Sequence, residues 1–429
     1  MVKVIVFFIL IFSIISTTLA QGENIDIKSL PDPCRKMVSA SLNGYVIFAG
    51  GLNSSSVTQT SRALVYDSTL ENPTIGSLSQ ARDNMAVVAI SDIVMFAGGD
   101  NGTFSNVQFT NVDIYNTTSK NWSLEHLSIA RSNVAAAAVN GMVFFAGGDN
   151  ATAAGMDIID VYNLSNRSWT TLTLPNKRSK MAATSIHELV IFANGVGAST
   201  FTVSDMSILN TTDWTWRTRQ SPNPRNSAKA LTVGEFVIIA GGATTIAVSD
   251  VEIYSYSKNS WTSANLAQAR TEFAAVAVVE YAVFGGGGNG VLGLPVGTLE
   301  IWNSLTNEWT EELMPPNRTF VTGVALDDKA IFAGGYGYDQ YPTILTTMNR
   351  IEIWQFSNAT LPTTTASPAP LISSKGPSDM STIIIAVVVV GVVVIVGVPL
   401  IVFFIYRRKK SNNYNSEGNI KMRVFSLIF

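Results

Sequence analysis

The segment Val143-Phe144-Phe145-Ala146-Gly147-Gly148-Asp149-Asn150 decides how the rest of the chain is interpreted. An apolar run leads into a glycine doublet, and a polar segment follows. Related doublets lie at Gly50-Gly51, Gly98-Gly99, Gly147-Gly148, Gly241-Gly242, Gly286-Gly287 and Gly334-Gly335, with a degenerate copy at Asn194-Gly195. Successive copies are 45 to 49 residues apart. Such a period indicates a repeat architecture, in which each repeat forms one unit that packs against its neighbours.

Each repeat predicts four short strands. In the third repeat, residues 133–139 and 142–146 are apolar runs, and Asn140-Gly141 between them is a favoured two-residue hairpin turn. Third and fourth strands are expected over residues 157–162 and 168–174. Short strands separated by regular turn signals predict an all-β propeller or sandwich.

Side-chain size favours the propeller. The first strands are rich in small residues, whereas the fourth strands carry Trp122, Trp169, Trp216, Trp261 and Trp309. Inner strands of a propeller crowd around a central channel, and outer strands diverge and leave gaps. Large aromatic rings are suited to fill those gaps.

Residues 35 to about 356 resemble kelch-repeat proteins. The resemblance rests on the apolar strand that ends in Gly-Gly, on the tryptophan that opens the fourth strand, and on an aromatic third-strand residue. The aromatic residues are Tyr66, Tyr115, Tyr162, Tyr254, Trp302 and Trp354. Repeat one lacks the tryptophan, and repeat four has Asn194 and Leu209 in place of the first glycine and the tyrosine. The resemblance implies a seven-bladed kelch-type β-propeller over residues 21–356.

The doublets are expected to be structural, because glycine allows the backbone to turn where a Cβ would clash. These glycines are Gly50, Gly51, Gly98, Gly99, Gly147, Gly148, Gly241, Gly242, Gly286, Gly287, Gly334 and Gly335.

The seventh repeat ends one strand short, at residues 351–354. Residues 25–31 resemble the fourth strands of the other repeats. We predict that this N-terminal segment closes the ring as the outer strand of the last blade, because an open edge would leave backbone groups unpaired.

Both ends of the chain predict a membrane protein. Residues 1–20 are typical of a secretory signal peptide, with an uncleaved anchor as the alternative. Residues 383–406 contain no charge and are long enough to span a bilayer. The basic run at residues 407–410 places the tail, 407–429, in the cytosol and the propeller outside or in a lumen. Residues 357–382 form a Ser/Thr/Pro-rich stalk. We therefore expect a single-pass type I protein of the plasma membrane or an internal membrane.

Ten Asn-x-Ser/Thr sequons precede the span, and none follows it, which supports this topology. The predicted glycosylation sites are Asn53, Asn101, Asn116, Asn121, Asn150, Asn163, Asn166, Asn210, Asn317 and Asn358. A formal net charge of −3, with six of the 28 basic residues after Tyr406, excludes a nucleic-acid partner.

The sequence contains no recognisable catalytic, cofactor or metal site. Its two histidines, His126 on an outer strand and His187 at a hairpin, are expected in different blades without clustered partners. Some kelch propellers are copper radical oxidases, but those need a histidine pair and a cysteine-crosslinked tyrosine. The segment Gly288–Gly293 matches a dinucleotide fingerprint without the helix that must follow it.

The single cysteine and the repeated arginines each allow two interpretations. Cys34 is either buried or paired with a second chain. The arginines that open the repeats either bind backbone carbonyls and acids or form a ring for an acidic ligand. These are Arg35, Arg82, Arg131, Arg178, Arg225, Arg270 and Arg318.

The predicted function is non-catalytic binding of a protein or glycan by the propeller loops. Tyr336, Tyr338 and Tyr341 in the longest loop are the candidate contact residues, with stiffening of the loop as the alternative. A carbohydrate-active enzyme on a kelch-like propeller is the second interpretation. A cytosolic kelch scaffold for actin or a ubiquitin ligase is the third, and the predicted topology disfavours it.

Overall fold

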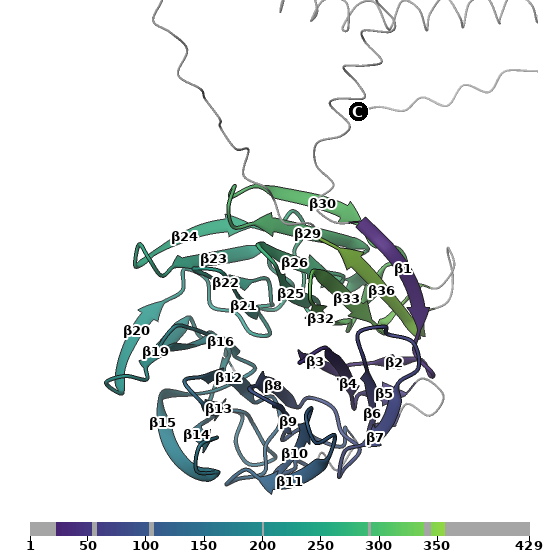
Figure 1. The fold of residues 1–429 in the computed structure, drawn as a ribbon. Coiled ribbons are helices and arrows are strands. Elements are labelled where there is room, and N and C mark those ends of the chain that lie inside the picture. Colours follow the sequence, from purple (N-terminus) through teal and green to yellow (C-terminus); the bar gives the residue numbers. More distant parts are fainter. Residues whose placement is uncertain are drawn as a thin grey trace, which may run out of the picture. The chain divides into compact units, whose positions relative to one another are not determined.

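The computed structural model describes residues 23–53, 58–102, 107–199, 201–290, 293–338 and 345–356, and every regular element in these ranges is a β-strand. Figure 1 shows strands grouped into sheets that radiate from a common centre. The predicted all-β class is therefore confirmed. The predicted signal peptide, stalk, membrane span and tail lie outside the described residues. Among those described, no helix has the length and apolar character needed to cross a membrane.

Seven sheets in the described residues share one plan, in which four antiparallel strands follow each other outward. Sheets one to seven follow the order of the repeats. Their inner strands are β3 (Val38–Leu42), β8 (Ala86–Ile90), β12 (Ala135–Val139), β16 (Ala182–Ile186), β21 (Lys229–Val233), β25 (Ala274–Val278) and β32 (Thr322–Leu326). Their second strands are β4 (Tyr45–Ala49), β9 (Ile93–Ala97), β13 (Met142–Ala146), β17 (Leu189–Ala193), β22 (Phe236–Ala240), β26 (Tyr281–Gly285) and β33 (Lys329–Ala333).

The outer half of each sheet consists of a third and a fourth strand. The third strands are β6 (Arg62–Tyr66), β10 (Asn111–Asn116), β14 (Met156–Asn163), β19 (Asp205–Asn210), β23 (Asp250–Ser255), β29 (Thr298–Asn303) and β36 (Arg350–Gln355). The outer strands are β7 (Thr74–Ser77), β11 (Trp122–His126), β15 (Ser168–Ser179), β20 (Thr215–Gln220), β24 (Ser260–Asn265), β30 (Trp309–Leu313) and, for sheet seven, β1 (Glu23–Ser29).

Short strands join the connections between the main strands. They are β2 (Cys34–Arg35), β5 (Leu52–Asn53), β18 (Val196–Gly197), β27 (Gly288–Asn289), β28 (Leu294–Pro295), β31 (Arg318–Thr319), β34 (Tyr336–Tyr338) and β35 (Leu345–Thr347). The pair β27–β28 forms where the sequence matches a dinucleotide fingerprint, so this glycine-rich segment enters a strand pair.

The apolar core lies between neighbouring sheets. In β13, Val143, Phe144 and Phe145 are fully buried, because both faces of the second strand are covered. One apolar cluster combines Phe145 of sheet three with Met95 of sheet two, and Trp169 packs against it. The tryptophans thus fill gaps between sheets, as predicted from their position on the fourth strands.

The two ends of the repeat array meet. On the inner strands, Ser39 Oγ of sheet one lies 2.6 Å from Thr322 Oγ1 of sheet seven and donates a hydrogen bond to the Gly323 carbonyl. At the outer edge, β1 pairs antiparallel with β36, with Lys28 opposite Ile351 (Figure 1). The predicted pairing of the N-terminal segment with the last repeat is confirmed, and it covers the outer edge of β36.

Deletion of residues 23–29 should lower the melting temperature by about 10 °C or more, because it exposes the edge of β36 and the core beneath it. Ile27→Ser is the matched control, since the Ile27 side chain is 52% exposed and the substitution keeps the backbone pairing. Differential scanning calorimetry of both variants measures the effect. An unchanged melting temperature after the deletion would show that β1 contributes nothing to the fold.

Candidate functional site

The glycine doublet ties each sheet to the connection that enters the next sheet. The Gly148 N–H donates to the Arg178 carbonyl at 3.0 Å. A Cβ at Gly147 would lie 2.3 Å from that carbonyl oxygen, and one at Gly148 would lie 2.7 Å from the Ser132 oxygen. Both glycines also have positive φ, at +61° and +102°. A side chain at either position would therefore break the close approach of the two backbones.

Six of the predicted arginines insert their side chains into the sheet that follows and are fully buried there: Arg82, Arg131, Arg178, Arg225, Arg270 and Arg318. Arg131 illustrates the arrangement. Its Nη2 donates to the Phe145 carbonyl at 3.1 Å and lies 2.7 Å from Asp160 Oδ2. Buried charges need such partners, and the guanidinium groups are held by the protein. Of the two interpretations of these arginines, the structure therefore supports the one in which they bind backbone carbonyls and acids, and not the one in which they form a ring for an acidic ligand.

Two of the arginines lack a hydrogen-bonded carboxylate. Arg178 donates to Ser207 Oγ at 2.6 Å, and Arg318 lies 3.3 Å from Glu352 without hydrogen-bond geometry. Burial lowers the pKa of Arg178 to about 10 and that of Arg318 to about 10. Both side chains remain charged at neutral pH.

Repeat one departs from this pattern, and the assignment of Arg35 to it is wrong. The Gly335 N–H donates to the Cys34 carbonyl, so Cys34 occupies the position of the buried arginine. Leu64 lies opposite Phe48, as Asp160 lies opposite Phe145 in sheet three. Sheet one therefore contains neither the arginine nor the carboxylate of the buried ion pair. Arg35, one residue later, instead places its guanidinium 4.4 Å from the centre of the Tyr336 ring.

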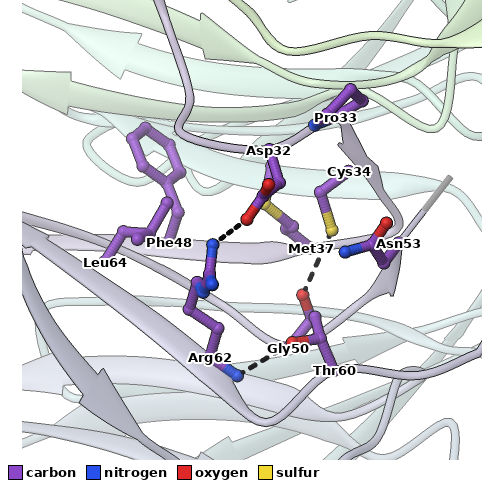
Figure 2. Close-up of a pocket in the computed structure, with 10 residues that line it drawn as sticks. All are labelled: Asp32, Pro33, Cys34, Met37, Phe48, Gly50, Asn53, Thr60, Arg62 and Leu64. Atoms are coloured by element: carbon purple, nitrogen blue, oxygen red, sulfur yellow. Dashed lines mark hydrogen bonds and ion pairs between the residues drawn. The ribbon is translucent and has the colours of Figure 1, made fainter. Parts of the chain in front are cut away.

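A cavity of about 70 Å³ remains where the arginine side chain would lie. Figure 2 shows Cys34, Met37, Phe48 and Leu64 around it, with an ion pair between Arg62 and Asp32 beside them. Cys34 Sγ lies 3.5 Å from the Gly50 carbonyl oxygen. Burial raises the pKa of Cys34 to about 12, so the thiol stays protonated. The residue is buried, in agreement with the first of its two interpretations.

The residue two places after each buried arginine, and two places after Cys34, lines one end of the central channel. All seven have positive φ between 52° and 57°: Lys36, Asn84, Asn133, Lys180, Ser227, Glu272 and Phe320. Backbone hydrogen bonds run from one to the next, as from Lys180 N to Asn133 O and from Asn133 N to Asn84 O. Together with Lys229 they line a cavity of about 390 Å³, which we call the channel mouth.

Exposed apolar side chains lie on the same face of the propeller as the channel mouth. They lie in the connections between second and third strands, and 40–74% of each is exposed: Val107, Phe201, Ile246, Leu294 and Leu345. We call this set the apolar loop residues. Sequence reasoning missed them, because single apolar residues in polar loops carry no periodic signal. Tyr336 and Tyr338 lie on the same face in β34, where Tyr336 contacts Arg35, whereas Tyr341 lies outside the described residues.

A pair of buried carboxyl groups lies beside the channel mouth, and it was also missed. Asp83 and Asp100 are 2% and 4% exposed, and Asn84 Nδ2 lies 3.3 Å from Asp83 Oδ1 and 3.0 Å from Asp100 Oδ2. Burial is the main cause that raises the pKa of Asp83 to about 6; Asp100 raises it further, and Lys36 opposes the shift. In sheet three, Ser132 takes the position of Asp83 and donates a hydrogen bond of 2.9 Å to Asp149, which takes the position of Asp100. The sequence contained a signal for this pair, because an aspartate follows both the arginine, in Arg82-Asp83-Asn84, and the glycine doublet, in Gly98-Gly99-Asp100.

The carboxyl pair does not have the geometry of a glycosidase site. The two side chains are hydrogen-bonded to each other, whereas retaining glycosidases separate their carboxyl groups by about 5–5.5 Å. Asp100, but not Asp83, lines a cavity of about 620 Å³ that Asn133, Asp149 and Lys180 also line.

The two histidines lie in different sheets, His126 on β11 and His187 between β16 and β17. His187 contacts two side chains of sheet five. Its Nε2 lies 3.0 Å from Glu235 Oε1, and its ring centre lies 4.1 Å from that of Tyr256. In the described part of the chain, no three side chains of the metal-binding types form a group.

The predicted glycosylation sites lie at the surface. All nine that fall within the described residues are half-buried or exposed: Asn53, Asn101, Asn116, Asn121, Asn150, Asn163, Asn166, Asn210 and Asn317. Asn358 lies outside the described residues. Their occupancy stays a prediction.

Comparison with known proteins agrees with the resemblance seen in the sequence. Residues 85–288 match the family described as the KLHDC2/KLHL20/DRC7 Kelch-repeats domain. A solved structure titled "Structure of YjhT" is similar with a TM-score of 0.51 and 15% sequence identity, over 66% of this chain and 99% of that chain. At this identity the likeness shows the fold alone. No curated protein matches the chain. The predicted kelch repeats are thereby confirmed over residues 85–288, and the β-propeller fold is confirmed.

Asp83→Asn should stabilise the protein at neutral pH. The folded-state pKa near 6 lies above the ordinary value of 3.8, so the folded protein binds more protons between these values, and stability falls as pH rises through this window. The variant should melt roughly 2–5 °C above the wild type at pH 7.5 and close to it at pH 4. Asp213→Asn is the control, because hydrogen bonds from Thr215 lower the pKa of Asp213. Equal melting temperatures of the wild type and Asp83→Asn at pH 7.5 would show that ionisation of the buried Asp83 does not destabilise the protein.

The Cys34 thiol should be inert in the native protein, because it is buried and protonated. Ellman's reagent at pH 8 should show almost no reaction until guanidinium unfolds the chain, and then one equivalent. Rapid reaction of the native protein, or a dimer that reducing agent dissolves, would instead indicate an accessible cysteine.

Proposed function

We propose that this chain is a non-catalytic recognition protein, a closed seven-bladed kelch-type propeller that binds a protein or glycan partner and is held in a membrane by a single span. The observation that carries the proposal is the cavity of about 390 Å³ at the channel mouth, together with the apolar loop residues on the same face. Binding residues concentrate on loops that a rigid scaffold positions. Exposed apolar side chains around a concave, polar surface are typical of interaction sites.

The charges at the channel mouth restrict the partner. Lys36, Lys180 and Lys229 contribute positive charge to the channel mouth, and Glu272 contributes one negative charge. A complementary partner would combine apolar groups for the loop residues with polar or acidic groups for the mouth. Tyr336 and Tyr338 belong to the same face and would extend this surface, and we propose that Tyr341, outside the described residues, contributes to it.

The proposed location rests on the sequence. The uncharged segment 383–406, the basic run that follows and the sequons before it all place the propeller outside the cell or in a lumen. Protease digestion of intact and permeabilised cells tests this topology, together with glycosidase-induced mobility shifts. A propeller digested only after permeabilisation of the plasma membrane, and unchanged by glycosidase, would favour the cytosolic kelch scaffold for actin or a ubiquitin ligase.

A carbohydrate-active enzyme is the second candidate, and the observation that favours it is the cavity of about 620 Å³, which two carboxyl groups, those of Asp100 and Asp149, line. Asp100→Asn separates the two functions. In an enzyme it would abolish turnover of a susceptible glycoside while binding persists, whereas a recognition protein would show no turnover before or after the substitution.

The triple variant Phe201→Ser, Ile246→Ser and Leu294→Ser should reduce capture of the partner at least tenfold, because it removes the exposed apolar side chains without touching the core. Quantitative proximity labelling with the full-length protein, compared between wild type and variant, measures the loss. Leu313→Ser is the matched control, since this side chain is 75% exposed on the outer strand β30, away from the loops. Identical neighbour profiles for the wild type and the triple variant would remove the proposed surface.

A further inference from the structure

In sheets two to five, one position on the outer strand lies against the tryptophan of the next sheet. It is the residue paired with the start of the third strand, as Glu125 pairs with Val112. Glu125 Oε2 accepts a hydrogen bond from Trp169 Nε1 at 3.4 Å, and the Arg219 guanidinium lies 4.4 Å from the centre of the Trp261 ring. The equivalent Leu172 and Ala264 share apolar clusters with Trp216 and Trp309.

Sheet one has a glycine at this position. Gly76 pairs with Ala63 in the same register, so this position carries no side chain against Trp122 of sheet two. A Cβ at Gly76 would lie 2.9 Å from Trp122 Nε1 and 3.2 Å from two indole carbons. Its φ lies outside the left-handed region, so the backbone alone does not require glycine. The glycine is required by the close approach of the indole.

The result is a cavity of about 320 Å³ between sheets one and two, on the side of the molecule away from the channel mouth. This volume is at the lower end of the range typical of small-molecule sites, roughly 300–1,000 Å³. Three aromatic side chains line it, Tyr45, Tyr115 and Trp122. The Tyr115 and Trp122 ring centres are 5.0 Å apart, so the aromatic wall is continuous.

The polar side chains at the cavity carry balanced charge. Lys120 Nζ lies 5.8 Å from the centre of the Tyr45 ring, and Asp67 and Asn72 also line the cavity. Hydrogen bonds from Thr69 to Asp67 Oδ1 lower the pKa of Asp67, which keeps the carboxylate ionised. One ammonium group and one carboxylate disfavour a ligand of high net charge. They suit a neutral ligand with many hydroxyl groups.

We propose that this cavity binds a neutral pyranose ring of a glycan. The ring would place its C–H face against Trp122 and its hydroxyl groups toward Asp67, Asn72 and Lys120. An aromatic wall with a few polar groups at its rim is the arrangement that matches the two kinds of surface on a sugar. The site is separate from the channel mouth, so either can fail without the other.

The glycan has two sources with the same chemistry. It belongs to a partner, or it is carried by this chain, whose sequon Asn121 immediately precedes Trp122. The experiment must therefore distinguish an external sugar from an attached one.

The test is titration of the full-length protein with methyl glycosides of glucose, galactose, mannose and N-acetylglucosamine, followed by tryptophan fluorescence and saturation-transfer NMR. At least one glycoside should bind saturably, and Gly76→Glu should weaken it at least tenfold because the new side chain fills the cavity. Ala264→Glu is the matched control, since it adds the same side chain at the equivalent position of sheet five. No saturable binding of any of the four, or equal affinity in Gly76→Glu, overturns the proposal.

Two further variants keep the test decisive. If Gly76→Glu does not fold, Asp67→Asn combined with Asn72→Ala changes only exposed side chains and should also weaken binding severalfold; unchanged affinity overturns the proposal. Asn121→Gln separates the sources. Equal sugar affinity with and without this substitution assigns the cavity to an external glycan, and affinity that appears only with it assigns the cavity to the attached glycan. Absence of binding in both overturns the proposal.

Discussion

The hydrogen bond from the second glycine of each doublet to the carbonyl of the next connection is the contact on which the propeller depends. It joins consecutive sheets at the same point of every repeat, as from Gly51 to Arg82 and from Gly99 to Arg131. The same connection then sends an arginine side chain into the core of the following sheet. A backbone contact that tolerates no Cβ and a buried charge that needs its partners therefore fix how each sheet is placed relative to the next.

Two of the cavities and the buried carboxyl pair lie where one repeat differs in sequence from the others. In sheet one, Cys34 and Leu64 stand in place of a buried ion pair and line a small cavity (Figure 2). Gly76 carries no side chain against Trp122, and both residues line the larger cavity between sheets one and two. Asp83 and Asp100 place two carboxyl groups where sheet three has Ser132 and Asp149. A repeat protein can vary these positions one at a time, because each repeat contacts only its neighbours.

The strand plan was predictable from the sequence because it follows from period and turn chemistry. The glycine doublets, the Asn-Gly hairpin and the tryptophans each restrict the backbone locally, and the N-terminal strand β1 was recognisable from the missing strand of repeat seven. Contacts that depend on alignment between repeats were less predictable. Arg35 was assigned to the arginine position because the residue type matches, whereas the backbone places Cys34 there. The partners of His187 come from separate segments, and no local pattern in the sequence indicates such contacts. The carboxyl pair also joins separate segments, and it could be found only by aligning the residues after the arginine with those after the glycine doublet.

The most direct test of the central contact is thermal unfolding of Gly148→Ala beside Gly141→Ala. Both glycines have positive φ, at +102° and +71°, so each substitution strains the backbone. Only Gly148 lies against another backbone; no heavy atom lies within 4 Å of a Cβ placed at Gly141. Gly148→Ala should lower the melting temperature several degrees more than Gly141→Ala. Equal losses would contradict the account, because they would show that the approach of doublet to connection adds nothing beyond the cost of the backbone angle.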